Sequence, residues 1–154
     1  MTRDVVVTEV AGGLAQEVRA GRHVFRSDEP VSSGGTDTGP DPYALLLAAL
    51  GSCTSMTLRI YARRKAWPLE GISVALSHER VHAKDCENCE TTDDARISRI
   101  AREITLTGAL SPEQRARLLE IAERCPVHRT LTGKFRIVTE LADARDPRGS
   151  PRRP

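Results

Sequence analysis

Apolar and polar residues along this chain follow two different spacings, one typical of strands and one typical of helices. Six segments show the alternation or the β-branched runs of short strands: 3–10, 14–19, 22–27, 72–83, 96–108 and 134–141. Two other segments repeat apolar residues at helical spacing, from 42 to about 66 and from 112 to about 124. The pattern therefore predicts a chain in which strands and helices are mixed.

The first predicted helix carries the strongest helical signal. Pro42 suits the first helical position, and Trp67-Pro68 ends the helix. Its first half is apolar on nearly all sides, which indicates a buried central helix. No apolar run reaches the roughly 18 residues that span a bilayer, so we expect no membrane segment.

The second predicted helix has clear signals at both ends. Ser111 suits the capping position and Pro112 the first turn. Four apolar residues are expected to face inward: Leu118, Leu119, Ile121 and Ala122. Cys125-Pro126 ends the helix, and a short helical turn over 127–131 follows.

The segments between these elements are polar or rich in glycine and proline. Residues 28–42 predict a long loop of a kind that is often functional. Residues 85–94 predict an acidic loop, and residues 142–154 a disordered tail rich in Arg and Pro. A chain of 154 residues suits one domain, which we place at residues 1–141.

Composition narrows the classes of function. Aromatic residues make up only 3% of the chain, so Leu, Ile, Val and Ala fill a thin core that dimerisation would help to stabilise. A formal net charge of +2 gives no reason to expect a nucleic-acid partner. No signal peptide is recognised, so we expect a cytoplasmic protein whose four cysteines are reduced. Metal binding or redox chemistry then explains the cysteines better than structural disulfides do.

Cys53 lies within the first predicted helix. Its face carries three apolar residues at helical spacing: Leu46, Ala49 and Leu50. A core cysteine is one interpretation, but its small neighbours leave room for a ligand: Gly51, Ser52 and Thr54. The helix begins about 11 residues earlier, too far for its dipole to activate the thiol. A reactive Cys53 therefore needs a cation from elsewhere in the fold, most plausibly an arginine.

Cys125 ends the second predicted helix. Pro126 stops that helix and can begin another turn, which would put Cys125 at a helix N-terminus, where a thiolate is favoured. A buried cysteine without a chemical role fits the same position.

Two motifs together resemble a known family. GPDPYALLLAALGSCTSMTLRIYARRK at 39–65 and RLLEIAERCPVHRTL at 117–131 resemble the OsmC/Ohr (organic hydroperoxide resistance) superfamily, most of all its OsmC-like branch. The similarity in order and spacing runs from about residue 5 to 141. It implies an α+β fold and an intertwined homodimer, with long central helices packed inside wrapped antiparallel sheets and two active sites at the subunit interface.

The resemblance also implies a reaction in oxidative-stress defence. Cys53 would attack an organic or lipid hydroperoxide, and Cys125 would convert the resulting sulfenic acid to a disulfide. A dithiol reductant, often lipoyl-linked in the family, would restore the thiols, with no metal or organic cofactor. The apolar surroundings of Cys53 favour an apolar organic hydroperoxide over hydrogen peroxide, with Leu46, Ala49 and Leu50 as the substrate-binding residues.

One family position differs in this chain. Related reductases begin the central helix with Asn-Pro-Glu, and the glutamate pairs with the arginine that activates the cysteine, whereas Tyr43 stands here. Arg19, Arg22 and Arg26 lie in the region that would supply the arginine, and Arg22 is our choice. A redox-sensing or small-ligand-binding dimer whose thiols do not turn over is the first alternative.

The acidic Cys86-Glu87-Asn88-Cys89 segment gives the second alternative. Its carboxylates disfavour a thiolate nucleophile, but Cys86 and Cys89 offer two zinc ligands. His78 and His82 share one face of the preceding strand and would complete a structural zinc site, as would the same cysteines of a dimer partner. An ordinary or disulfide-bonded loop fits the same residues. His128, beside Cys125, either tunes that thiol or is simply hydrogen-bonded.

Overall fold

The computed structural model describes residues 4–82 and 96–141, and these residues form two compact units. One unit comprises Met1–Pro42 with Phe135–Pro154, and the other comprises Tyr43–Lys134. The predicted single domain over residues 1–141 stays a prediction. The predicted acidic loop and C-terminal tail lie outside the described residues.

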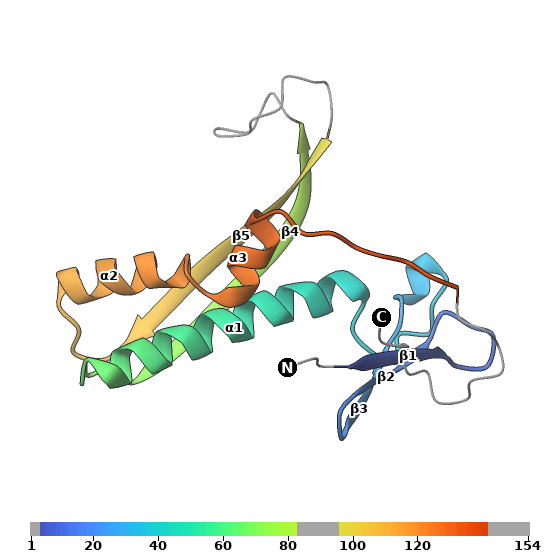
Figure 1. Cartoon of the computed structure of the whole chain (residues 1–154), viewed down its shortest axis with the longest axis horizontal. Helices are drawn as coiled ribbons and strands as arrows, with labels where there is room; N and C mark the ends of the chain where they lie inside the picture. The colour runs from blue at the N-terminus through green and yellow to red at the C-terminus, as the bar shows by residue number, and fades with distance from the viewer. Residues whose placement is uncertain (1–3, 83–95, 142–154) are drawn as a thin grey trace. The chain divides into compact units, whose positions relative to one another are not determined.

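The first unit contains a three-stranded antiparallel sheet in the order β1-β2-β3 (Figure 1). Its strands are β1 (Val5–Glu9), β2 (Gln16–Ala20) and β3 (His23–Ser27). The central strand places Val18 between Val7 and Phe25. Because the turn after β2 needs a positive φ, Gly21 stands there with φ +60°. The three strands predicted near the N-terminus are thus confirmed, with shorter bounds.

Asp28 organises the long loop that follows β3. Its carboxylate accepts hydrogen bonds from the backbone and hydroxyl groups of Thr36 and Thr38 and from the backbone N–H of Glu29. The hydroxyl of Thr36, followed by the other donors, holds the pKa of Asp28 well below its usual range. The loop, which also contains the short helix η1 (Val31–Ser33), is therefore held in one conformation by hydrogen bonds to Asp28.

The strand predicted over residues 134–141 is wrong. These residues have no regular structure, and no strand pairs with them within the described parts of the chain. Phe135, Ile137 and Leu141 are 61%, 79% and 102% exposed. The sequence does alternate, but a strand also needs a hydrogen-bonded neighbour, which the described residues of the single chain do not supply.

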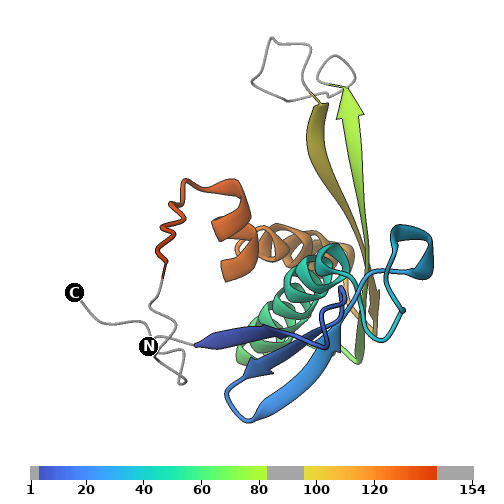
Figure 2. The ribbon, with the colours of Figure 1, turned by 90° about the vertical axis from the view of Figure 1, so that its right-hand side faces the viewer.

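The second unit packs helices onto a long hairpin. Its elements are α1 (Pro42–Arg64), β4 (Gly71–His82), β5 (Arg96–Thr107), α2 (Pro112–Ala122) and α3 (Pro126–Thr132). β4 and β5 pair antiparallel over their full length, and α1 and α2 lie on the same side of them (Figure 2). The core joins both helices to one residue after α1 and one before α2: Leu58, Ala62, Leu69, Leu110, Leu118, Ile121 and Ala122.

Helix α1 is buried on one face only. Leu50, Thr54, Leu58 and Ala62 form the buried stripe at four-residue spacing. The exposed face carries apolar residues such as Met56, which is 64% exposed. The prediction of a buried central helix is therefore confirmed for one face of the helix in the single chain.

The length and composition of α1 correct one expectation. With 23 residues and a mean hydropathy of 1.3 over its most apolar 18-residue window, it is long and apolar enough to cross a bilayer, contrary to the expectation from the sequence. Core helices of soluble proteins pass the same test. Since α1 contributes Leu58 and Ala62 to the core of the second unit, we assign it as a core helix.

Helix α2 begins with the predicted cap. The Ser111 hydroxyl accepts a bond from the Gln114 N–H at 3.1 Å, and the Gln114 side chain accepts one from the Ser111 N–H at 2.9 Å. Leu118, Ile121 and Ala122 face the core as expected, but Leu119 is 62% exposed. The expectation for Leu119 was wrong because successive helical residues are rotated by about 100°.

Candidate thiol site

Cys125 lies at the junction of α2 and α3. Its side chain is fully buried, and its backbone N–H donates to the Ala122 carbonyl at 3.4 Å. Pro126 then begins α3, so Cys125 is the N-cap of that helix. The sulfur accepts a hydrogen bond from the His128 backbone N–H at 3.3 Å. The predicted change of helix at Pro126 is confirmed, and it gives Cys125 Sγ a fixed donor.

The Cys125 sulfur also touches the central helix. Its Sγ lies 3.7 Å from Oγ1 of Thr54, a residue that is itself fully buried. Thr54 directly follows Cys53, which is half-buried on the neighbouring face of α1, and both cysteines are free. The fold therefore brings Cys125 against the residue that follows Cys53, although 71 residues separate Thr54 from Cys125 in the chain, and the pairing of the two thiols stays a prediction.

The three residues predicted to line the substrate site differ in exposure. Leu50 is 5% exposed, Leu46 is half-buried and Ala49 is exposed. Leu50 also lines a hollow of about 400 Å³ beside α3. The other lining residues come from β5, α2 and α3: Ser98, Ile100, Arg102, Ile104, Leu119, Glu123, His128, Leu131 and Thr132.

Arg102 is a residue of this site that the sequence analysis missed. It stands on the inward face of β5 between Ile100 and Ile104, and only 11% of its side chain is exposed. Its Nη1 donates to Thr54 Oγ1 at 2.9 Å and to the Ala122 carbonyl at 3.3 Å. The alternation of β5 contained the signal, since Arg102 has the same parity as the inward apolar residues.

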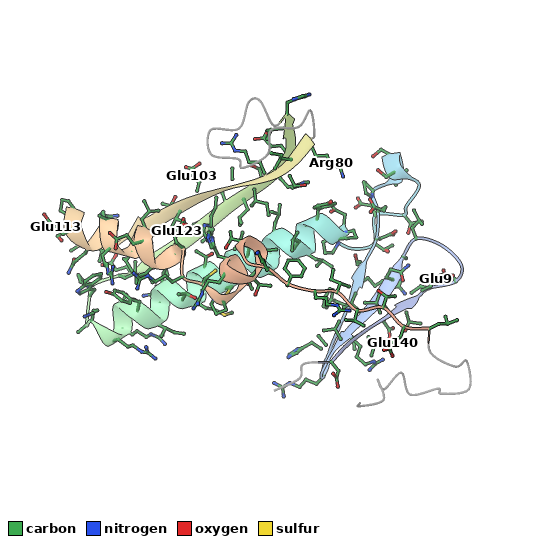
Figure 3. The ribbon with its side chains drawn as sticks, turned by 45° about the horizontal axis from the view of Figure 1, so that its top comes forward. Glu9, Arg80, Glu103, Glu113, Glu123 and Glu140 are labelled. Atoms are coloured by element: carbon green, nitrogen blue, oxygen red, sulfur yellow. The ribbon has the colours of Figure 1, made fainter. Side chains whose placement is uncertain are left out.

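The second nitrogen of Arg102 contacts α2 and α3. Its Nη2 lies 3.4 Å from the Glu123 carboxylate, labelled in Figure 3, and 3.5 Å from His128 Nδ1. Because a guanidinium only donates, Nδ1 is the acceptor and the neutral imidazole carries its hydrogen on Nε2. That Nε2 lies 3.5 Å from the other Glu123 oxygen. His128 is thus held by Arg102 and Glu123, while its backbone N–H serves Cys125.

The predicted activating arginine belongs to the other unit. Arg22 lies in the turn between β2 and β3, and its role toward Cys53 stays a prediction. Of its two rivals, Arg19 forms an exposed pair with Glu17 at 3.1 Å, and Arg26 belongs to β3.

Tyr43, which replaces the family glutamate, has an aromatic partner instead of a charged one. It stacks on His78 with ring centroids 4.4 Å apart and planes 16° from parallel. The Nε2 atom of His78 is buried and has no hydrogen-bond partner among the residues that the structure describes. The beginning of α1 is thus anchored to β4 by ring stacking.

The predicted zinc site is not tested by the described residues. Cys86 and Cys89 lie outside them, and within residues 4–82 and 96–141 no three metal-binding side chains gather. His78 and His82 lie on β4, where His78 packs against Tyr43.

Comparison with known proteins identifies a family model and a fold. The model described as OsmC-like protein matches residues 35–140. No curated protein matches the chain. Many solved structures share its fold at low sequence identity, and three of them illustrate the similarity.

The OsmC-like protein from Mycoplasma pneumoniae has a TM-score of 0.68 at 18% identity, covering 86% of this chain and 89% of that one. The organic hydroperoxide resistance protein from Elizabethkingia anophelis has a TM-score of 0.63 at 18% identity, covering 86% and 89%. The organic hydroperoxide resistance protein OhrB of Bacillus subtilis has a TM-score of 0.59 at 19% identity, covering 86% and 92%. The predicted α+β, OsmC-like fold is confirmed.

Proposed function

Because this chain belongs to the family of OsmC-like proteins, we propose that it is a thiol peroxidase that reduces organic hydroperoxides in oxidative-stress defence. The observation that carries the proposal is the contact of the Cys125 sulfur with Thr54, the residue next to Cys53 on α1. A two-cysteine peroxidase needs two reduced thiols that can reach each other, and both Cys53 and Cys125 are free.

The proposed reaction begins at Cys53. Its thiolate attacks the terminal oxygen of the hydroperoxide, the O–O bond breaks, and the alkoxide takes a proton and leaves as an alcohol. Cys53 is then a sulfenic acid. Cys125 attacks that sulfur, water leaves, and a Cys53–Cys125 disulfide forms. An external dithiol, such as a lipoyl group, reduces the disulfide, so the proposal requires no metal or organic cofactor.

An organic hydroperoxide is the proposed substrate because the residues near the thiols are apolar. Leu46, Ala49 and Leu50 precede Cys53 by seven, four and three residues on α1. Two of the structural neighbours carry organic hydroperoxide resistance in their names. Proteins of this family are soluble, and a cytoplasmic homodimer is part of the proposal.

The test is peroxide turnover by wild type and two single-cysteine variants. Wild type should consume cumene hydroperoxide continuously with dihydrolipoamide as the reductant, and Cys53→Ser should not. Cys125→Ser should consume about one equivalent and accumulate the sulfenic acid, which a dimedone adduct detects. Mass spectrometry of wild type after one equivalent should show a Cys53–Cys125 disulfide.

A matched control uses the other two cysteines. The double variant Cys86→Ser and Cys89→Ser should turn over like wild type, because the proposal gives these thiols no role. Consumption by wild type at the rate of Cys53→Ser would refute the peroxidase. Disulfide formation without turnover would favour the redox-sensing alternative, and stoichiometric zinc lost in the double variant would favour the zinc-binding one.

A further inference from the structure

Arg102 is a buried cation on a mostly apolar face of the hairpin. The neighbouring inward residues of β5 are Ile100 and Ile104, and its partner across the hairpin is Leu76. Burying an arginine there is costly unless its charge is used or compensated. Among the described residues its two Nη groups contact Thr54 Oγ1, the Ala122 carbonyl, Glu123 and His128.

We propose that Arg102, acting through the Thr54 hydroxyl, favours the thiolate form of Cys125 and holds it ready to attack the Cys53 sulfenic acid. Arg102 and Thr54 are positioning residues in this proposal, because Thr54 touches the resolving thiol, Arg102 acts through Thr54, and neither is assigned a contact with the peroxide. The inference rests on the proposed function, since it explains how the second thiol of that reaction is made nucleophilic.

The Thr54 hydroxyl has one hydrogen and three neighbours. Its Oγ1 accepts from Arg102 at 2.9 Å, lies 2.7 Å from the Leu50 carbonyl and 3.7 Å from Cys125 Sγ. When Cys125 is a thiol, its S–H can donate to Oγ1 while the hydroxyl donates to Leu50. A thiolate only accepts, so the hydroxyl must then turn from Leu50 to the sulfur.

Arg102 favours the arrangement in which the Thr54 hydroxyl donates to the Cys125 thiolate over the one in which it donates to the Leu50 carbonyl. Its N–H bond to Oγ1 polarises the hydroxyl and makes it a stronger donor to the sulfur. Its positive charge also acts on the anion across the shared threonine, and both Thr54 and Cys125 are fully buried. The His128 backbone N–H completes the set with a second donor to Sγ at 3.3 Å.

Other charged groups face the same site from two further elements. Glu123 at the end of α2 lies 3.4 Å from Arg102 but is 64% exposed, so water screens its negative charge. His128 of α3 accepts from Arg102 through Nδ1 and is neutral in that arrangement. Among these groups, the buried guanidinium is the cation that acts on Cys125 through Thr54.

The chemical step balances with the thiols alone. The Cys125 sulfur attacks the Cys53 sulfur, the S–S bond forms and the S–O bond breaks. The departing hydroxide combines with the proton that Cys125 released, giving water. Cys125 is oxidised and the sulfenic sulfur is reduced. Arg102 and Thr54, together called the relay below, change only the fraction of Cys125 that is ionised.

The test measures thiolate directly in a protein whose only cysteine is Cys125, made by Cys53→Ser, Cys86→Ser and Cys89→Ser. The ultraviolet absorbance of the thiolate is followed against pH, with the fully cysteine-free protein as the baseline. This readout needs no reagent to reach a buried sulfur. Adding Thr54→Val or Arg102→Met should lower the thiolate fraction at neutral pH about tenfold, the factor of one pKa unit.

Conservative variants separate the relay from a merely structural role. Thr54→Ser keeps the hydroxyl and should keep the pH profile, whereas Thr54→Val keeps the shape and should shift it to higher pH. Arg102→Lys should retain part of the effect. Arg99→Met is the matched control, because Arg99 lies on the same strand, is 59% exposed and pairs with Glu79 outside the site.

Unchanged profiles in folded Thr54→Val and Arg102→Met proteins would overturn the relay. If Arg102→Met does not fold, Thr54→Val and Thr54→Ser decide the question. Since the titration involves no peroxide, a wild type without turnover would refute the proposed function and leave the titration result intact. Turnover together with unchanged profiles would refute the relay alone.

Discussion

Two adjacent leucines of α2 are expected to respond very differently to the same substitution. Leu118 is fully buried in the core of the second unit, whereas Leu119 is 62% exposed beside the hollow near α3. Their spacing alone made both appear to face inward. Leu118→Ala and Leu119→Ala therefore test whether α2 is oriented as the structure shows.

The exposures set the size of each effect. Leu→Ala removes three carbon atoms, worth about 2.4 kcal/mol when fully buried, at about 0.8 kcal/mol each. Leu118→Ala adds the cost of the cavity, so its total loss should be about 3–5 kcal/mol. Since Leu119 is about two fifths buried, Leu119→Ala should lose about two fifths of that transfer free energy, and it should leave no closed cavity. Its loss should be about 1 kcal/mol.

Trp67 is a local reporter for this measurement. It is the only tryptophan of the chain, and it packs against the core cluster that contains Leu118. Urea unfolding followed by Trp67 fluorescence therefore gives the free energy of unfolding of that unit. Wild type and both variants should be compared at two protein concentrations, because a dimer makes stability depend on concentration.

Equal losses in the two variants would refute the orientation of α2. A large loss for Leu119→Ala that grows on dilution would instead place Leu119 in a contact between subunits. A small loss for Leu118→Ala would contradict its position in the core. The expected difference of at least about 2 kcal/mol exceeds the usual error of such extrapolations.

Two further predictions concern the polar groups that fix local structure. Ser111→Ala should lower the free energy of unfolding by about 1 kcal/mol in the Trp67 assay, because it removes the cap of α2, whereas Ser111→Thr should lose less. Asp28→Asn should destabilise the loop over 28–42, because an amide cannot accept all five bonds that Asp28 receives, and limited proteolysis should then cut there sooner. Folding lowers the pKa of Asp28, so the stability that its carboxylate contributes is present above the unfolded pKa of about 3.9 and is lost as pH falls through the folded pKa. Acid should therefore speed cleavage of the loop in wild type, and less so in Asp28→Asn. Equal responses of the two proteins to acid would contradict this role.

Local signals in the sequence were sufficient for elements whose causes are local. The cap at Ser111 and the helix change at Pro126 depend on neighbouring residues, and both were predicted correctly. The prediction of a strand over residues 134–141 failed because strand pairing depends on a neighbouring strand that the alternation of apolar and polar residues does not specify. Leu119 failed because helical spacing left the edge of the buried face ambiguous.

The site itself depends on contacts that cross the chain. Cys53 and Cys125 were identified by their motifs, but the contact between Thr54 and Cys125 joins residues 71 positions apart. Arg102 was passed over because an arginine in a strand is expected to face water. Its inward direction follows from the register of β4 and β5, which places it opposite Leu76.

The surroundings of the two sulfurs argue for a division of labour between them. Cys53 is half-buried on α1 beside the exposed Ala49, so a peroxide from solution can reach it without unfolding the core. Cys125 is fully buried, and its sulfur is already in contact with Thr54 and the His128 N–H. A fully buried thiol is less accessible to an external oxidant than a half-buried one. It is better placed to react with a sulfenic acid that forms on a nearby residue. This difference in access, rather than the motif alone, supports Cys53 as the first nucleophile and Cys125 as the second.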